Sequence, residues 1–260
     1  MDKRGLFAEG PQWEEARAAA LAENPVSMEE AYDVVRTALK VAGGKHSFLW
    51  TKESMTERAT EDASTAPSVE VLEDGIVCIT LPHFSGQSLD ENQRYALTVL
   101  EALPETATGV VLDLRGNTGG NMYPMITAVH RFLPEGILLR FKSRKATMPV
   151  SKEFVLRSTS LEHQPQIECP VAILTDEKTA SSGEATLLCF RGLDYAKSFG
   201  SPTAGYASAN EPITMPDGSR LVLTTGCDVA RTGEIFCDDP IVPDVETADP
   251  MAAALSWLRQ

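Results

Sequence analysis

The stretch Val171–Glu184, VAILTDEKTASSGE, restricts the possible fold more than any other part of this chain. The apolar or small residues 171–174 predict a short buried strand, and the polar turn after them ends in two consecutive serines. The run 185–190 then predicts a helix. A helix that begins near Ser181 directs free backbone N–H groups and the positive end of its dipole toward that hydroxyl. Because an oxyanion would form there in acyl transfer, Ser181 is a candidate nucleophile.

The central part of the chain alternates strands with helices. Residues 109–114, GVVLDL, predict a buried strand, and a glycine-containing loop and a helix over 122–133 follow it. Other features are a hairpin at Asp74-Gly75, a capping box at Ser88 and Glu91, and a helix that starts at Asp249-Pro250. Further strands are predicted at 69–72, 76–81, 137–141 and 196–199, and 151–166 is polar. With a long hairpin at 216–218, this order predicts an α/β fold with an antiparallel part toward the C-terminal end.

Residues 1–68 predict a small helical subdomain with a histidine-bearing loop, followed by a core of residues 69–260. Pro11 suits a first helical turn, and Ser27 with Glu30 forms a capping box for a second helix that ends at a glycine pair. His46 follows directly, in GGKHSFLW, in a loop or at the start of an extended segment. The segment 51–68 is polar without a period and predicts a loop.

Composition limits the possible partners. The 260 residues carry a formal net charge of −14, which argues against nucleic acid or an anionic membrane as a partner. We find no run near the roughly 18 apolar residues of a membrane span and no signal-peptide core at the start. The chain as given is expected to be cytoplasmic, or exported or membrane-anchored if a signal segment has been removed. Its oligomeric state is not predicted.

The cysteines predict neither a zinc cluster nor a disulfide framework, and we expect no metal or other cofactor. There are five, with no CxxC spacing. Cys78 and Cys189 are expected in the core. Cys227 and Cys237 flank a short segment and could meet across a hairpin, although in a cytoplasmic setting a disulfide is the less favoured alternative.

The glycine-containing loop 113–120, DLRGNTGG, allows two interpretations. A glycine pair that enters a helix can bind phosphate, but the loop lacks the GK[ST] ending and the dinucleotide spacing. Beside a serine turn, it forms a second wall of an oxyanion hole. The two donors would be the backbone N–H of Gly119, or of Gly120, and that of Ser182.

A serine nucleophile needs a proton acceptor. Of the four histidines, His130 falls inside a predicted helix and His163 in a polar stretch without context. His83 closes a strand in LPHFSG and is the second choice, whereas His46 lies on a glycine hinge beside an aromatic segment. Lys178 does not fit the Ser-x-x-Lys order and is expected to be solvated.

Four ordered motifs carry a family resemblance. DLRGNTGG, TASSGE, GSPTAG (200–205) and IVPD (241–244) together resemble the tail-specific, or C-terminal processing, serine peptidases. The resemblance covers about 76–244 and implies a crotonase-like (ClpP/crotonase-type) ββα core. In the family's serine motif the nucleophile precedes the glutamate by three, which assigns it to Ser181 and leaves Ser182 as an oxyanion donor.

The chain departs from this family's serine–lysine branch. There the base is a lysine immediately after the GxPTxG motif, and here that position is Tyr206, a poor proton acceptor. In the tricorn-like and nisin-resistance-like branch the base is an upstream histidine, and GGKHSF resembles that motif, which favours His46. The short polar segment before the core leaves no room for a PDZ domain, which also resembles this branch.

A third catalytic member is not assigned. Some relatives place a glutamate where this chain has Cys237. Glu184, Glu234 and Asp239 are the nearby carboxylates, and a solvated surface position is the simplest interpretation of each. A backbone carbonyl could orient His46 instead.

The function predicted from the resemblance is that of a serine peptidase, a hydrolase that acts through an acyl-enzyme with a Ser181–His46 dyad. The expected substrate is a short or unfolded peptide held near its C-terminus. Two alternatives remain: a non-catalytic relative that binds a peptide or apolar ligand, and an esterase or amidase for small substrates.

Overall fold

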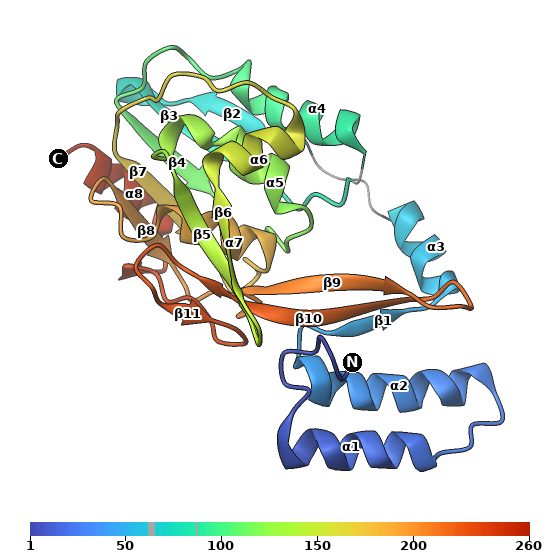
Figure 1. Ribbon diagram of the computed structural model, residues 1–260. Helices are drawn as coiled ribbons and strands as arrows, with labels where there is room; N and C mark the ends of the chain where they lie inside the picture. Colours follow the sequence, from blue (N-terminus) through green and yellow to red (C-terminus); the bar gives the residue numbers. More distant parts are fainter. Residues whose placement is uncertain (62–65, 87) are drawn as a thin grey trace. The chain divides into compact units, whose positions relative to one another are not determined.

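The computed structural model describes residues 1–61, 66–86 and 88–260. The chain forms two compact units (Figure 1). The smaller unit comprises residues 1–63, 141–147 and 208–227, and the larger unit comprises 64–140, 148–207 and 228–260. Two segments from the second half of the chain, 141–147 and 208–227, therefore belong to the same unit as the N-terminal residues. The division at residue 68 predicted from the sequence assigns both segments to the other part of the chain.

The larger unit is built on a six-stranded sheet in the order β12-β8-β7-β4-β3-β2 (Figure 1). Neighbouring strands from β3 to β12 pair in parallel, and β2 pairs antiparallel with β3. The hairpin between β2 and β3 turns at Asp74 and Gly75, whose φ angles of 60° and 74° suit the predicted turn. The strands are β2 (Ser68–Val71), β3 (Ile76–Thr80), β4 (Gly109–Asp113), β7 (Val171–Thr175), β8 (Ala196–Gly200) and β12 (Val245–Glu246).

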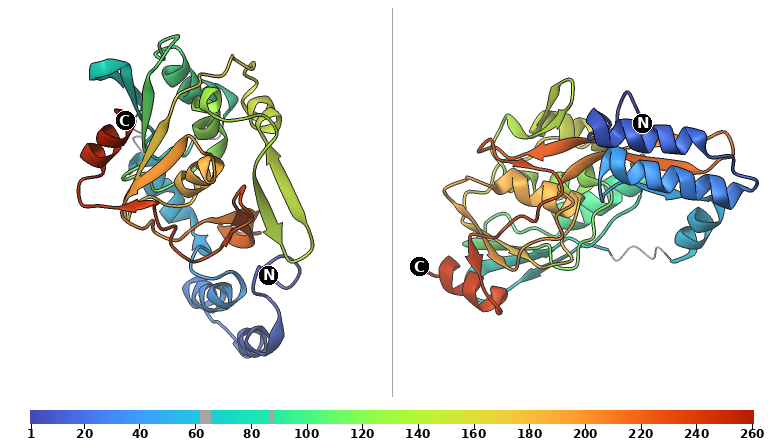
Figure 2. Two further views of the ribbon diagram at one scale, coloured as in Figure 1. Left: turned by 90° about the vertical axis from the view of Figure 1, so that its left-hand side faces the viewer. Right: turned by 90° about the horizontal axis from the view of Figure 1, so that it is seen from below.

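Helices cover both faces of this sheet. The crossovers β3–β4, β4–β7 and β7–β8 advance in one direction, so right-handed connections place their helices on one face. These helices are α4 (Leu89–Leu100), α5 (Met122–Ala128), α6 (Lys152–Thr159) and α7 (Ser182–Phe190). On the other face α8 (Pro250–Leu258) packs against β4, β7 and β8 (Figure 2). Every residue of β4 and β7 is buried, as their continuous apolar runs predict.

The smaller unit packs two helices on an antiparallel sheet. Strand β10 (Arg220–Val229) pairs with β1 (Phe48–Trp50) and β9 (Ser208–Thr214), and the β9–β10 hairpin turns where the sequence predicts. The helices are α1 (Gly10–Ala22) and α2 (Met28–Gly43), and Ser27 caps α2 as expected. The core of this unit contains Trp13, Leu39, Leu221 and Leu223.

Several elements differ from the prediction. Helix α3 (Lys52–Glu61) occupies part of the expected loop, whose residues 62–65 lie outside the described residues. The stretch taken as polar contains α6 and the end of β6 (Thr147–Ser151), which follows β5 (Ile137–Ser143). The expected helix 122–133 is instead α5 and a 3-10 turn, His130–Phe132.

Cys78 and Cys189 are buried, as expected, but the expectation for Cys227 and Cys237 is not met. Cys227 and Cys237 are disulfide-bonded, whereas Cys78, Cys169 and Cys189 are free. The register of β10 with β11 (Ile235–Phe236) pairs Asp228 with Phe236, the two residues next to the bonded cysteines. The preference for reduced cysteines at these positions was therefore wrong.

Among the described helices, none has the length and apolar character needed to span a bilayer.

Candidate active site

Ser181 has a strained backbone at the start of α7. Its φ and ψ are 52° and −113°, a region that residues with a Cβ atom rarely occupy. Such a conformation costs about 1–3 kcal/mol and persists only where surrounding contacts impose it. Helix α7 begins at Ser182, and Ser181 is half-buried, so the strand–turn–helix arrangement predicted from the sequence is confirmed.

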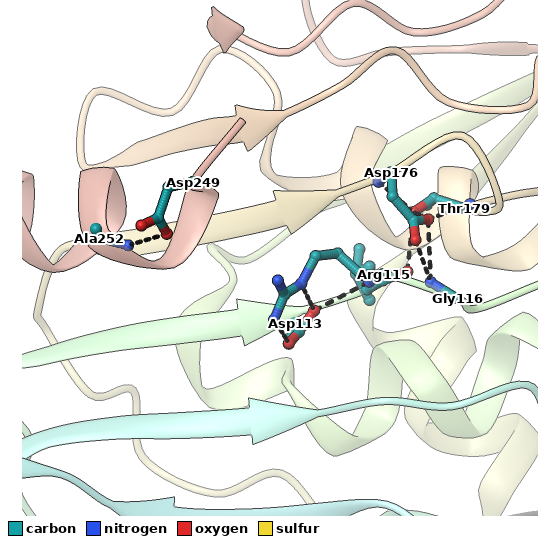
Figure 3. A network of polar contacts seen from close by, with 8 residues as sticks. Asp113, Arg115, Gly116, Asp176, Thr179, Asp249 and Ala252 are labelled. Carbon is teal, nitrogen blue, oxygen red and sulfur yellow. Dashed lines mark hydrogen bonds and ion pairs between the residues drawn. The ribbon is translucent and has the colours of Figure 1, made fainter. Parts of the chain in front are cut away.

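Asp176 holds the turn that carries Ser181 (Figure 3). Its carboxylate accepts hydrogen bonds from the N–H groups of Lys178 and Thr179 within the turn, at 3.0 and 2.9 Å. It also accepts the N–H of Gly116 at 3.0 Å, and the Thr179 hydroxyl donates to the Leu114 carbonyl at 2.9 Å. The serine turn and the glycine-containing loop after β4 are thereby fastened to each other.

Asn117 is the centre of the glycine-containing loop. It is fully buried, its Nδ2 donates to the Leu81 carbonyl at 2.8 Å, and its own carbonyl accepts the N–H of Ala180 at 2.9 Å. Gly119 lies directly against Ser181: a Cβ atom at Gly119 would approach Ser181 Cβ to 2.8 Å. Only glycine fits at this position, because φ is also +100°.

Three backbone N–H groups are candidate oxyanion donors. The N–H of Gly119 donates to Asn117 Oδ1 at 2.8 Å. The N–H of Gly120, an exposed residue, has no partner among the described residues. The N–H of Ser182 lies in the first turn of α7, where no intrahelical acceptor exists, and the Ser182 hydroxyl donates to the Gly120 carbonyl at 2.7 Å.

The three nearby carboxylates have different environments. Glu184 is fully buried, so its expected solvated position was wrong. Glu234 is partly exposed and forms an ion pair with Arg191 at 2.9 Å, and hydrogen bonds from Arg191 and Thr232 lower its pKa to about 2. Asp239 is exposed, as expected.

His46 lies in the smaller unit between α2 and β1. Its Nδ1 lies 2.8 Å from the hydroxyl of Ser208 at the start of β9, and Asn210 donates to the His46 carbonyl. The side chain is 9% exposed. Burial, with a contribution from the charge of Lys45, lowers the pKa of His46 to about 4, so the imidazole is neutral at pH 7.

The other histidines have structural contacts. His83 follows β3, and its Nδ1 lies 3.2 Å from the hydroxyl of Thr118, one residue before Gly119. His130 is buried, and its Nδ1 donates to the Thr127 carbonyl at 2.7 Å. His163 contacts Glu135 at 3.0 Å.

The four motifs form a single hydrogen-bonded system within the larger unit. The Thr203 hydroxyl donates to Glu184 of the serine motif and accepts the N–H of Ile241. The Asp244 carboxylate accepts from both the N–H and the hydroxyl of Ser198, in β8. The described residues contain no cluster of three or more histidine, cysteine or acidic side chains that could hold a metal ion.

The sequence of this chain is similar to those of known peptidases and their relatives. The sequence model of Peptidase family S41 matches residues 75–247. The nisin-resistance protein of Lactococcus lactis subsp. lactis is 34% identical over 272 residues, which cover 100% of this chain and 84% of that protein. The carboxy-terminal processing protease CtpA of Bacillus subtilis (strain 168) is 27% identical over 153 residues. That match covers 58% of this chain and 31% of CtpA, so the chain corresponds to about a third of the longer protease.

The fold is also similar to those of solved structures. A lipoprotein from Streptococcus agalactiae has a TM-score of 0.91 at 34% identity, with 99% of this chain and 92% of that chain covered. A photosystem II D1 C-terminal processing protease has a TM-score of 0.65 at 14% identity, with 96% and 90% covered, which shows a shared fold.

Proposed function

Since the chain belongs to peptidase family S41, whose members are serine-type peptidases, we propose that it hydrolyses peptide bonds with Ser181 as the nucleophile. The observation that carries this proposal is the strained backbone of Ser181 at the N-terminus of a buried helix. Strain of this kind exposes a serine hydroxyl above a sheet in other serine hydrolases. By the same family resemblance, we propose that the ββα core is crotonase-like.

His46 is the proposed general base. If its Nδ1–H donates to Ser208, then Nε2 carries the lone pair that can accept the Ser181 proton. The low pKa keeps His46 in the neutral form that a base needs before the reaction, and it also makes this imidazole a weaker proton acceptor than one with the ordinary pKa of 6.5. The hydroxyl of Ser208 would then take the orienting position that a carboxylate occupies in a Ser-His-Asp triad.

The proposed oxyanion donors are the N–H of Ser182 and one N–H from the glycine pair. Gly119 and Gly120 are both candidates, and the bond from the Gly119 N–H to Asn117 favours Gly120. Two donors with no other acceptor can stabilise the negative charge that develops on the carbonyl oxygen.

The reaction then has two steps. As Ser181 Oγ attacks the peptide carbonyl, its proton moves to His46, and the tetrahedral intermediate collapses when His46 returns that proton to the leaving amine. A water molecule, deprotonated by His46, attacks the acyl ester, and the serine recovers its proton as the acid product leaves. No cofactor is needed for this sequence.

The proposed substrate is a short or unfolded peptide. The Lactococcus lactis relative is named for resistance to nisin, and the CtpA relatives are named for processing at a carboxyl terminus. We further propose that the chain acts outside the cytoplasm, because Cys227 and Cys237 are disulfide-bonded and a relative of known structure is a lipoprotein.

Hydrolysis of a peptide library by the wild type and matched variants tests this function. Ser181→Ala and His46→Ala should each lower kcat by at least about 100-fold, the size of a general acid–base contribution, while His83→Ala should change it little. Ser208→Ala should cost up to about tenfold through one lost hydrogen bond. Unchanged hydrolysis by Ser181→Ala contradicts the mechanism, and loss in His83→Ala but not in His46→Ala reassigns the base.

The two alternatives give different results. A peptide-binding relative without catalysis would retain library peptides at unchanged mass in both the wild type and Ser181→Ala. A small-substrate esterase would cleave activated esters with the same dependence on Ser181 but leave all peptides intact.

A further inference from the structure

Glu184, three residues after the proposed nucleophile, accepts four hydrogen bonds. Its Oε2 accepts the N–H of Ser181 at 2.7 Å and the N–H of Tyr206 at 2.8 Å. Its Oε1 accepts the N–H of Gly205 at 2.9 Å and the hydroxyl of Thr203 at 2.5 Å. One carboxylate with no exposed surface thus connects the serine turn to the segment 203–206.

The bond to Ser181 acts at the strained residue itself. Ser181 has positive φ without the freedom of glycine, so its backbone must be held by its surroundings. Its N–H is held by Glu184, and its carbonyl accepts the N–H of Ala185 in α7. Of these two hydrogen bonds, the one to the Glu184 carboxylate is made by a side chain.

The four donors favour an ionised side chain. An ionised carboxylate is acceptor-only, whereas an acid or an amide would turn a hydrogen toward at least one of the donors. Burial raises the pKa of Glu184, and the four hydrogen bonds oppose that effect.

A second buried carboxyl group, that of Asp228, interacts electrostatically with Glu184. Asp228 is 2% exposed, and among the described residues its Oδ1 has no hydrogen-bond partner. Burial and the charge of Glu184 raise the pKa of Asp228 well above its ordinary value. Glu184 has the four donors, so it is the better placed of the two to carry the negative charge, and burial beside that charge favours the protonated form of Asp228.

We propose that ionised Glu184 is a positioning residue that holds Ser181 in its reactive conformation by tying the serine turn to residues 203–206. This role rests on the proposed function, in which Ser181 is the nucleophile. It also explains why TASSGE and GSPTAG occur together in this chain: the glutamate of one motif binds the threonine and the last glycine of the other.

The test is the rate at which a fluorophosphonate labels Ser181 in Glu184→Gln, measured beside the melting temperature. Glu177→Gln is the matched control, because Glu177 is exposed in the same turn. We expect labelling by Glu184→Gln to slow at least about tenfold, as for the loss of one or more net hydrogen bonds, with Glu177→Gln within about twofold of the wild type. In the wild type the rate should fall as acid protonates Glu184, whose pKa is raised by burial, and in Glu184→Gln only the fall caused by protonation of His46, with its pKa of about 4, should remain.

Wild-type labelling rates in folded Glu184→Gln would overturn the proposal. If Glu184→Gln does not fold, Thr203→Val removes one donor to Glu184 at nearly constant volume, together with the acceptor of the Ile241 N–H. Slower labelling, restored by Thr203→Ser, supports the proposal, and an unchanged rate overturns it. Asp228→Asn should keep the wild-type rate because the native group is neutral, and a slowed rate would contradict the charge assignment. If wild-type Ser181 is not labelled at all, the proposed function has failed instead.

Discussion

At the scale of single residues, the space beside Ser181 depends on Gly119. Gly119→Ala would bring a methyl group to 2.8 Å from Ser181 Cβ, where one of the two must move. Because a displacement of 1 Å at reacting atoms can cost about 100-fold, we expect peptide hydrolysis to fall 10- to 100-fold.

Gly136→Ala is the control for this change. Gly136 also has a positive φ, +88°, but nothing lies within 4 Å of its Cβ position. Gly136→Ala should have a lower melting temperature than the wild type because of backbone strain, and it should keep full activity. Equal activity losses in both variants would mean that strain, and not the contact with Ser181, is responsible.

The pKa of His46 gives a second prediction at this scale. Burial lowers that pKa from 6.5 to about 4, so the neutral imidazole persists down to about pH 4 in the folded protein, whereas the unfolded chain takes up the proton near pH 6.5. His46 therefore reduces stability as the pH falls from about 6.5 to 4. A proton NMR titration, with the resonance assigned by His46→Gln, should give a value well below 6.5. A value at or above 6.5 would contradict the buried, neutral base.

Some site residues follow from the sequence and others do not. Ser181 and Ser182 could be predicted because strand, turn and helix are encoded locally. The burial of Glu184 depends on residues 203–206, far along the chain, so its position alone suggests a solvated surface. One local pattern does indicate its bond to Ser181: Ser-x-x-Glu is the capping-box spacing, in which the glutamate accepts the N–H of the first residue. No comparable pattern indicates Ser208.

At the scale of elements, Asp176 joins the loop after β4 to the turn after β7. Asp176→Ala would leave the N–H groups of Gly116, Lys178 and Thr179 without this acceptor. We expect the free energy of unfolding to fall by about 1–3 kcal/mol, as for a lost set of partly buried hydrogen bonds, and activity to fall with it.

Urea denaturation measures this loss. Asp194→Ala is the control, because Asp194 is exposed on a different loop of the same unit. A change of less than about 0.5 kcal/mol in Asp176→Ala, the range of ordinary surface substitutions, would show that the two loops are held by other contacts.

The predictable elements are those with strong local patterns. The capping boxes of α2 and α4 and the apolar runs of β4 and β7 each give the correct type of element. The sequence analysis did not predict helix α6, because one of its buried positions is a lysine, Lys152. A charged residue at a buried position interrupts the apolar pattern by which a helix is recognised. That lysine donates to the Leu133 carbonyl and Glu135, partners that the local sequence does not show. Helix α3 has little apolar periodicity, so its sequence pattern does not predict a helix. Most helices in proteins are stabilised by tertiary packing rather than by the local sequence.

At the scale of the whole molecule, the number of reactive thiols among the five cysteines shows whether the disulfide has formed. The structure has three free cysteines, and Cys227 and Cys237 are disulfide-bonded. Protein purified without reductant and then denatured should react with three equivalents of Ellman's reagent, and with five after reduction. Five equivalents without reduction would contradict the bond and weaken the case for a site of action outside the cytoplasm.

The central claim is that Ser181 is the nucleophile of a working peptidase. Its most direct test is the intact mass of the protein after treatment with a fluorophosphonate, followed by mapping of the modified peptide. We predict one adduct, on Ser181, that is absent from Ser181→Ala and strongly reduced in His46→Ala. An unmodified protein that is demonstrably folded, or an adduct on another residue, would contradict the claim.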